Sequence, residues 1–250
     1  MSVQSVERTF TIISYLSSKP KPQSLSAVAN ACNLPPATAF RLLKTLIDLG
    51  YACNENGGFY SLTPKLFSMT SSVVANNSVI SYIKPHLVRL SEKANESVHL
   101  VMQDGNDILY VDKVAKNPES VNMASYIGMR LPMYCTAAGK ALLSTLSNDE
   151  ITRIFNCSDV HKITPNTITT LDGLLANLEQ AAQKGYCIDR EENEVGITCI
   201  AVAIGKAPDG KKYAFSVSSL TARMEEERIE ELSVIMHDTL SHIIKELGMS

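Results

Sequence analysis

The sequence lacks the features that mark membrane, secreted and disulfide-stabilised proteins. Its 250 residues contain no run of about 18 apolar side chains, the length that a membrane-spanning helix needs. No charged and then apolar leader follows Met1. The six cysteines include no CxxC pair, which argues against both a zinc ribbon and a disulfide framework. We therefore expect a cytoplasmic protein without a membrane partner, whose cysteines are small buried side chains.

Catalytic and metal-binding patterns are also missing. The five histidines form no motif, and none lies at ligand spacing from the acidic run Asp189–Glu194, which is typical of a solvated surface. A nucleophilic Cys199 would need a base nearby, and no motif supplies one. His99, within an apolar segment, is interpreted as a core histidine. The sequence thus predicts no enzyme activity, no catalytic residue, no metal site and no cofactor.

The charge is low overall but unevenly distributed. The net charge of −3 is not typical of a nucleic-acid-binding protein. Residues 1–70 nevertheless hold six Lys or Arg against three acidic residues, and the remainder holds 17 against 23. The first part is therefore cationic by +3 and the second anionic by −6. This division fits a DNA-binding domain joined to a second domain that does not contact DNA.

The cationic part contains two short helices separated by a tight break. Ser24 stands where a helix N-cap belongs, before apolar residues at helical spacing. Residues 33–34 interrupt the pattern, and the prolines at 35–36 restart it, because proline is tolerated in the first turn of a helix. Gly50 ends the second helix at a C′ position. The apolar stripe of this helix consists of Ala39, Leu42, Leu43, Leu46 and Ile47.

This pattern predicts a helix-turn-helix whose second helix enters the DNA major groove, although an ordinary helical hairpin has the same pattern. Small or apolar side chains on its opposite face suit thymine methyl groups, and basic ones suit phosphate or guanine. We assign DNA binding to Ala37, Thr38, Phe40, Arg41 and Lys44. Strands at residues 51–53 and 59–62 form a wing. With a helix at residues 3–17, residues 1–63 are predicted to be a winged helix-turn-helix domain.

The rest of the chain is predicted to be a linker helix at residues 64–78 and an α+β domain at residues 79–250. Strands are expected at 98–102, 108–113, 121–127, 199–204 and 213–219. Helices are expected at 79–94, about 135–146, 149–155, 171–184 and 225–247.

Two segments of this second domain fit a site for a small acid. Residues 134–140 have small side chains at a strand-to-helix transition. Either the N–H groups of Ala137 and Ala138 are free to bind an anion, or the small side chains allow the start of the helix to pack closely. In the last strand, Ser216 and Ser218 share one face, where they either orient a carboxylate or lie exposed on the sheet.

Long segments of both domains resemble those of one family. SVERTFTIISYL and LPPATAFRLLKTLIDLGY lie in the first domain. LPMYCTAAGKALL, GYCIDREENEVGITCIAVAI and a strand of alternating serines lie in the second. These segments are similar to those of the IclR family of transcriptional regulators. The resemblance implies a GAF/PAS-like effector-binding domain with an antiparallel sheet, a small carboxylate or sugar-acid effector, and a homodimer or dimer of dimers. It implies effector contacts at Met123, Leu131, Ala137, Ala138, Asp189, Ile197, Cys199, Ser216 and Ser218.

We therefore predict a ligand-responsive DNA-binding regulator, acting as a repressor of a small-acid or sugar-acid catabolic operon. Its partners would be double-stranded operator DNA and the effector. The linker helix would convert effector binding into a change in the spacing of the recognition helices, and several DNA-binding domains per assembly would supply the affinity that one weakly cationic domain lacks. Two alternatives stay open: a partner-binding sensor with weakened DNA contacts, and an enzyme acting on a small acid.

Overall fold

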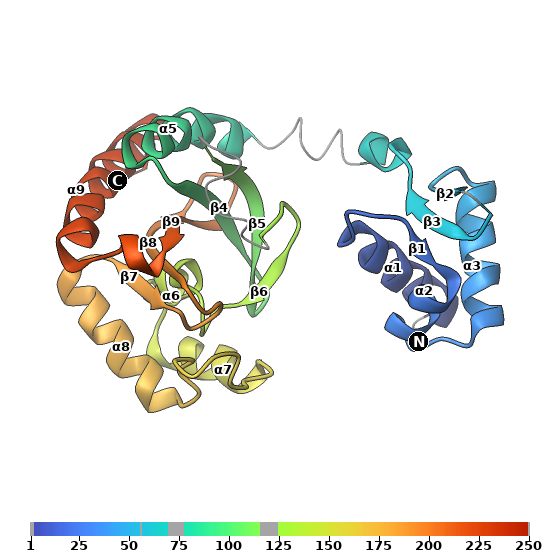
Figure 1. The fold of residues 1–250 in the computed structure, drawn as a ribbon. Helices are drawn as coiled ribbons and strands as arrows, with labels where there is room; N and C mark the ends of the chain where they lie inside the picture. Colours follow the sequence, from blue (N-terminus) through green and yellow to red (C-terminus); the bar gives the residue numbers. More distant parts are fainter. Residues whose placement is uncertain (1–2, 56, 70–77, 116–124, 250) are drawn as a thin grey trace. The chain divides into compact units, whose positions relative to one another are not determined.

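The computed structural model describes residues 3–55, 57–69, 78–115 and 125–249 (Figure 1). The chain divides into two compact units, at residues 1–77 and 78–250. Within the described residues, no helix is long and apolar enough to cross a membrane.

In its described residues, the N-terminal unit contains three complete helices and a small antiparallel sheet, and residues 65–69, at the start of the predicted linker helix, are also helical. The helices are α1 (Gln4–Ser17), α2 (Leu25–Ala31) and α3 (Pro36–Asp48). The strands are β1 (Gln23–Ser24), β2 (Ala52–Glu55) and β3 (Phe59–Leu62), in the spatial order β1-β3-β2. The β2–β3 hairpin is the predicted wing. Strand β1 was not predicted, because two residues are too few to show an alternating pattern.

The ends of α2 and α3 confirm the turn chemistry expected from the sequence. The Ser24 side chain caps α2 by accepting a hydrogen bond from the Ala27 amide at 3.2 Å. Asn33 ends that helix in the left-handed region, with φ of 50°. At the end of α3, Gly50 has φ of +78°, and the Tyr51 amide donates to the Leu46 carbonyl at 2.8 Å. Both helices therefore end in the hydrogen-bonding pattern of a Schellman motif.

The core of this unit confirms the predicted apolar stripe of α3 and includes only the second half of α1. Ala39, Leu43 and Leu46 of α3 are buried. On α1 the buried residues are Ile12 and Leu16, and not the apolar residues Val6 and Phe10 of its first half. The Val6 and Phe10 side chains are 51% and 59% exposed, so the first half of α1 presents an apolar stripe to solvent.

The C-terminal unit is built on one antiparallel sheet of six strands in the order β6-β5-β4-β9-β8-β7. These strands are β4 (Ser97–Asp104), β5 (Asp107–Val114), β6 (Arg130–Pro132), β7 (Cys187–Arg190), β8 (Ile197–Lys206) and β9 (Lys212–Leu220). The helices are α5 (Ser78–Ala94), α6 (Ala137–Leu143), α7 (Asn148–Cys157), α8 (Leu171–Lys184) and α9 (Glu226–Glu246), with a short 3-10 turn η1 (Thr221–Arg223).

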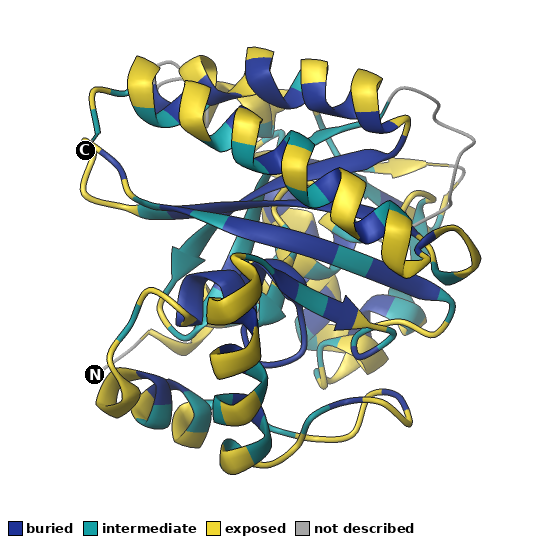
Figure 2. Cartoon of the chain, turned by 90° about the vertical axis from the view of Figure 1, so that its left-hand side faces the viewer, coloured by how far each residue is buried: buried dark blue, intermediate teal, exposed yellow. Residues whose placement is uncertain are grey.

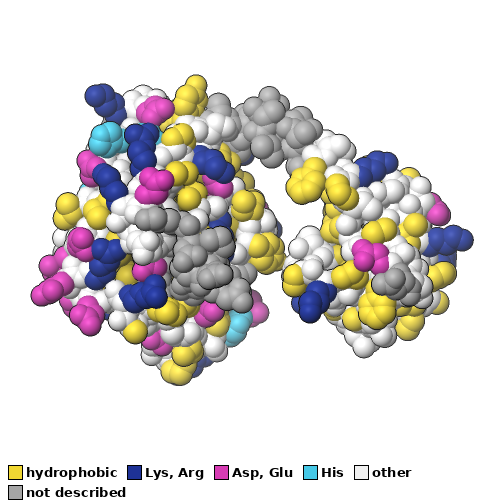
Figure 3. Space-filling view, turned by 45° about the horizontal axis from the view of Figure 1, so that its top comes forward, with side chains coloured by type: hydrophobic (Ala, Val, Ile, Leu, Met, Phe, Trp, Pro, Cys, Tyr) yellow, Lys and Arg dark blue, Asp and Glu magenta, His cyan; other side chains and the backbone are white. Residues whose placement is uncertain are grey.

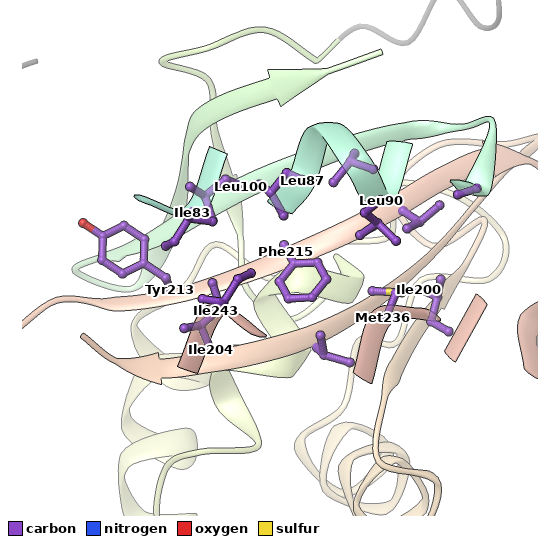
Figure 4. Close-up of a cluster of buried hydrophobic side chains, with 14 of the residues drawn as sticks. Ile83, Leu87, Leu90, Leu100, Ile200, Ile204, Tyr213, Phe215, Met236 and Ile243 are labelled. Atoms are coloured by element: carbon purple, nitrogen blue, oxygen red, sulfur yellow. The ribbon is translucent and has the colours of Figure 1, made fainter. Parts of the chain in front are cut away.

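Helices cover both faces of this sheet. Figure 1 shows α5 and α9 on one side and α6, α7 and α8 on the other. The long helices are exposed on their outer faces and buried where they meet the sheet (Figure 2). Under α5 and α9, the apolar side chains of β8 and β9 fill the interface (Figure 4). That core includes Ile83, Leu87, Leu90, Leu100, Ile200, Ile204, Tyr213, Phe215, Met236 and Ile243.

Most predicted elements of this unit are present with ends shifted by a few residues, but the strand predicted at 121–127 is wrong in the part that is described. Residues 121–124 lie outside the described residues, and residues 125–128 form a turn with no strand. Gly128 has φ of +93°, and its amide donates to the Tyr110 carbonyl at 2.8 Å. On the side of β5 away from β4, the pairing partner is therefore β6, a three-residue strand that the sequence did not predict.

Candidate functional site

The recognition helix α3 presents the predicted DNA-binding side chains on its solvent face. Ala37, Phe40, Arg41 and Lys44 are exposed, with Phe40 at 47%, while Thr38 is half-buried. Burial of the opposite stripe against α1 and α2 fixes this orientation. Four of the five residues named from the sequence therefore lie on one exposed face of α3, as expected of a helix that enters the major groove.

Residues that follow the wing hold the C-terminal end of α3. The Thr63 hydroxyl donates to the Gly50 carbonyl at 2.6 Å. The Lys65 ammonium donates to the Leu49 carbonyl at 2.8 Å and lies 4.9 Å above the Tyr51 ring. A cation at this end also complements the helix dipole. The beginning of the predicted linker is thus bonded directly to the recognition helix, although residues 70–77 lie outside the described residues.

In the C-terminal unit, the sheet lines a small cavity of about 60 Å³. Every strand contributes to its lining. In the order of the sheet these side chains are Leu131, Tyr110, His99, Ser218, Cys199 and Asp189. Loop residues Ser125, Met129, Asn193 and Glu194 complete the lining with Ile197 at the start of β8.

A row of hydrogen bonds runs across the centre of this lining. The Cys199 thiol donates to the Ser218 hydroxyl at 3.0 Å. The Ser218 oxygen lies 3.4 Å from Nδ1 of His99, and Nε2 of His99 lies 3.0 Å from the Ser125 hydroxyl. The Lys113 ammonium donates to the same hydroxyl at 3.0 Å. The cavity is therefore a polar site whose groups already orient one another.

Burial keeps most of these groups neutral. Desolvation, with the nearby charge of Lys113, lowers the pKa of His99 to about 3. Desolvation also raises the pKa of the Tyr110 hydroxyl and of the Cys199 thiol well above their usual ranges. The same cause raises the pKa of Asp189 to about 7, against the opposing hydrogen bond from the Glu192 amide to its carboxylate. Near neutral pH the lining therefore offers hydroxyl, thiol and imidazole groups and a half-protonated carboxyl.

This arrangement does not activate a nucleophile. The structure places a histidine two hydrogen bonds from Cys199, which the sequence could not reveal. An activated cysteine, however, needs a lowered thiol pKa and a histidine able to take its proton. Here the thiol pKa is raised and the imidazole pKa is lowered. The pair favours binding over covalent catalysis.

Two carboxylates of the acidic run beside the cavity are buried, which the interpretation of the run as a solvated surface did not predict, whereas Glu194 is exposed as predicted. Asp189 and Glu192 are 4% and 5% exposed. The Glu192 carboxylate lies 2.5 Å from the ammonium of Lys140, which is fully buried on α6. The Thr167 hydroxyl donates to the Glu192 carbonyl at 2.7 Å. These contacts fasten the wall that carries Asp189, Asn193 and Glu194.

The structure brings together five of the nine predicted effector residues. Leu131, Asp189, Ile197, Cys199 and Ser218 line the cavity. Three others, Ala137, Ala138 and Ser216, are buried but are not among its lining residues. Met123 lies outside the described residues. The alternative of exposed serines is wrong, since both are less than 5% exposed.

The sequence analysis missed the contributions of His99 and Tyr110 to the cavity. His99 is indeed buried and hydrogen-bonded, as a core histidine would be, but it also lines the cavity. Its ring meets Tyr110 edge-on, with the centroids 5.4 Å apart. Both residues lie inside largely apolar strands. Their only signal in the sequence is a polar side chain at a position within such a strand, on the face of the sheet that carries the serines.

A winged helix-turn-helix joined to a separate α+β unit with an internal polar cavity defines a class of transcription regulators. Comparison with known proteins gives the family. The model of the IclR helix-turn-helix domain matches residues 5–53, and that of the bacterial transcriptional regulator IclR C-terminal domain matches residues 71–244. The chain belongs to the IclR family of bacterial transcriptional regulators, a family of DNA-binding proteins and not of enzymes.

Relatives match the chain along almost its whole length. The HTH-type transcriptional repressor AllR of Salmonella typhimurium is 33% identical over 248 residues, which are 98% of this chain and 90% of that protein. The crystal structure of Thermotoga maritima IclR is similar with a TM-score of 0.77 and 30% identity, covering 98% of this chain and 99% of the other. An IclR homologue from Microbacterium hydrocarbonoxydans complexed with 4-hydroxybenzoate shares the fold, with a TM-score of 0.79, 20% identity and coverage of 98% and 100%.

Proposed function

We propose that this protein is a cytoplasmic repressor that binds operator DNA through α3 and responds to a small carboxylate or sugar acid held in the C-terminal cavity. The observation that carries the proposal is the lining itself, to which all six strands of the sheet contribute. A ligand there touches every strand at once, so its binding free energy acts on the whole unit. The similarity to a protein named as a repressor supports the direction of regulation.

The lining suits an acid group that is bound by neutral donors. None of the described lining residues is Lys or Arg, and Glu194 is a second acidic residue of the lining beside Asp189. A carboxylate would therefore be held by the hydroxyls of Tyr110 and Ser218 and by the protonated form of Asp189. A volume of about 60 Å³ limits the enclosed part of the ligand to a few non-hydrogen atoms. We assign the effector contacts to Leu131, Asp189, Ile197, Cys199 and Ser218, and add His99 and Tyr110.

Homodimerisation, or assembly as a dimer of dimers, is part of the same proposal. Val3, Val6 and Phe10 follow the i, i+3, i+7 spacing on α1, and all three are more than half exposed. A second copy of the chain would cover this stripe. Two or four recognition helices in one assembly would raise the affinity for DNA without any new contact.

The experiment is a thermal-shift screen of small carboxylates and sugar acids with two matched variants. Ser216→Ala and Ser218→Ala each remove one buried hydroxyl from the same face of β9, but only Ser218 lines the cavity. A ligand at 100 times its Kd stabilises the folded unit by about 2.7 kcal/mol. We expect a compound that shifts the melting temperature of the wild type and of Ser216→Ala, but not of Ser218→Ala. No shift with any acid, or equal shifts in all three proteins, would overturn this assignment.

A further inference from the structure

The N-terminal unit carries three basic side chains at a surface hollow that α1 and the recognition helix α3 line together. Arg8 of α1 lines this hollow together with Arg41 and Lys44 of α3. Gln4, Thr38 and one acidic residue, Asp48, also line it. Arg8 is half-buried, so its side chain has less conformational freedom than that of a fully exposed arginine.

Among the described residues, none of these three cations has an ion-pair partner. All ion pairs between the described residues lie in the C-terminal unit. In the N-terminal unit, Lys19 lies over the Tyr15 ring and Lys65 bonds the end of α3. On the face visible in Figure 3, basic and acidic side chains intermingle over the C-terminal unit, while acidic ones are sparse on the N-terminal unit. Three basic groups at one hollow, opposed by Asp48 alone, form a site for an anion.

We propose that this hollow binds a backbone phosphate of the DNA, with Arg8 as the contact supplied by α1. The inference rests on the proposed function, because it requires that α3 enters a major groove. A side chain from the supporting helix lies beside the recognition helix and meets the groove edge, where the phosphates are. Arg suits this position because its planar fork matches phosphate oxygens. Arg8 therefore sets the register of α3 and carries no sequence preference.

The test compares Arg8→Gln with Lys19→Gln, a control that removes one charge from the same unit outside the hollow, and with Arg41→Ala. The full-length proteins are titrated against a duplex selected from a random pool and against an unrelated duplex of equal length, at several salt concentrations. Arg8→Gln should weaken binding to both duplexes by the same factor. It should also reduce the slope of log K against log salt by about 0.9 per DNA-binding domain. Arg8→Lys should keep the slope, and Lys19→Gln should behave as wild type.

Each outcome decides between the phosphate contact and the function on which it rests. If Arg8→Gln leaves affinity and slope unchanged while Arg41→Ala loses sequence preference, the phosphate contact is refuted and DNA binding stands. If Arg8→Gln weakens only the selected duplex at an unchanged slope, Arg8 does not bind a phosphate. If the wild type binds neither duplex, both proposals fall together. The melting temperature of each variant separates loss of contact from loss of fold.

Discussion

Lys140 brings a full positive charge into the core beneath the sheet, where it meets a single carboxylate. Its side chain is fully buried, and its ammonium lies 2.5 Å from Glu192 Oε1. Glu192 Oε2 has no hydrogen-bond partner among the described residues. The pair is therefore incompletely compensated, and each partner depends on the other.

Removing only the cation should destabilise this unit strongly. Lys140→Met leaves a buried carboxylate without its counter-charge, which costs about 3–5 kcal/mol of the free energy of unfolding. The double variant Lys140→Met/Glu192→Leu removes both charges and should recover most of that loss. Urea unfolding of the C-terminal unit measures both. Equal stability of the single and double variants would show that the ion pair does not stabilise the cavity wall that carries Asp189.

With Asp189 as a proposed effector contact, its raised pKa predicts that effector affinity depends on pH. Below its pKa of about 7 the carboxyl is protonated and donates a hydrogen bond, and above it the carboxylate repels an anion. The affinity for a carboxylate effector should therefore weaken by up to about tenfold for each pH unit above 7.

Asp189→Asn keeps a neutral donor at this position and should remove the pH dependence between pH 6 and 8. Isothermal titration at several pH values measures this. A wild-type affinity that is flat with pH would exclude an anionic ligand held by Asp189 and favour a neutral one.

At the scale of elements, the start of α6 requires the absence of a side chain at one position. A Cβ at Gly139 would lie 2.4 Å from the Met133 carbonyl oxygen and 2.5 Å from its Cα, both backbone atoms that cannot yield alone. Gly173 is the matched position of α8: in both helices a threonine N-cap accepts from the glycine amide, at 3.1 Å and 3.2 Å. A Cβ at Gly173 would meet only side-chain atoms, at 2.8 Å and 3.2 Å.

Gly139→Ala should therefore lower the free energy of unfolding by about 1–3 kcal/mol, and more than Gly173→Ala does. Thermal unfolding of both variants measures the difference. The same close approach supports the packing interpretation of the segment 134–140, whereas an anion bound at Ala137 and Ala138 stays a prediction. A Gly139→Ala variant as stable as Gly173→Ala would show that the helix start has room to move.

How much of the fold the sequence predicts depends on the length of each element. The helix α8 was predicted with its exact ends, because fourteen residues show the 3.6-residue period and Gly185 marks the end. Strands β1 and β6 were missed, since two and three residues are too few to show an alternating pattern, and β7 was missed because it ends in the acidic run that was interpreted as a solvated surface. The burial of Asp189 and Glu192 was missed because the ion pair joins residues 52 positions apart.

The candidate site was only partly predictable for a similar reason. Cys199 was named because its segment resembles that of a family, whereas Ser218 was also a candidate from the strand pattern that places it on one face with Ser216. His99 joins them through a contact between residues 119 positions apart, which depends on the register between β4 and β9. Local spacing does not contain that information. The DNA-binding face needed no such contact, since Ala37, Arg41 and Lys44 lie on one helix.

At the scale of the whole molecule, the proposed regulation requires that ligand binding in one unit changes DNA binding by the other. Coupling free energies of about 1–3 kcal/mol, or roughly 5- to 150-fold in affinity, are typical of such regulators. The ligand must therefore prefer one of two arrangements of the assembly, because equal affinity for both would shift nothing. The hydrogen bonds from Thr63 and Lys65 to the end of α3 connect the beginning of the predicted linker to the recognition helix.

The most direct test is the affinity for operator DNA with and without the compound found in the thermal-shift screen. Fluorescence anisotropy of a labelled operator duplex gives the Kd for the wild type, Ser216→Ala and Ser218→Ala. We predict that the three proteins bind equally without the compound, and that the compound changes the Kd of the wild type and of Ser216→Ala only. A wild-type Kd that the compound leaves unchanged, or a change that persists in Ser218→Ala, would contradict regulation of DNA binding through this cavity.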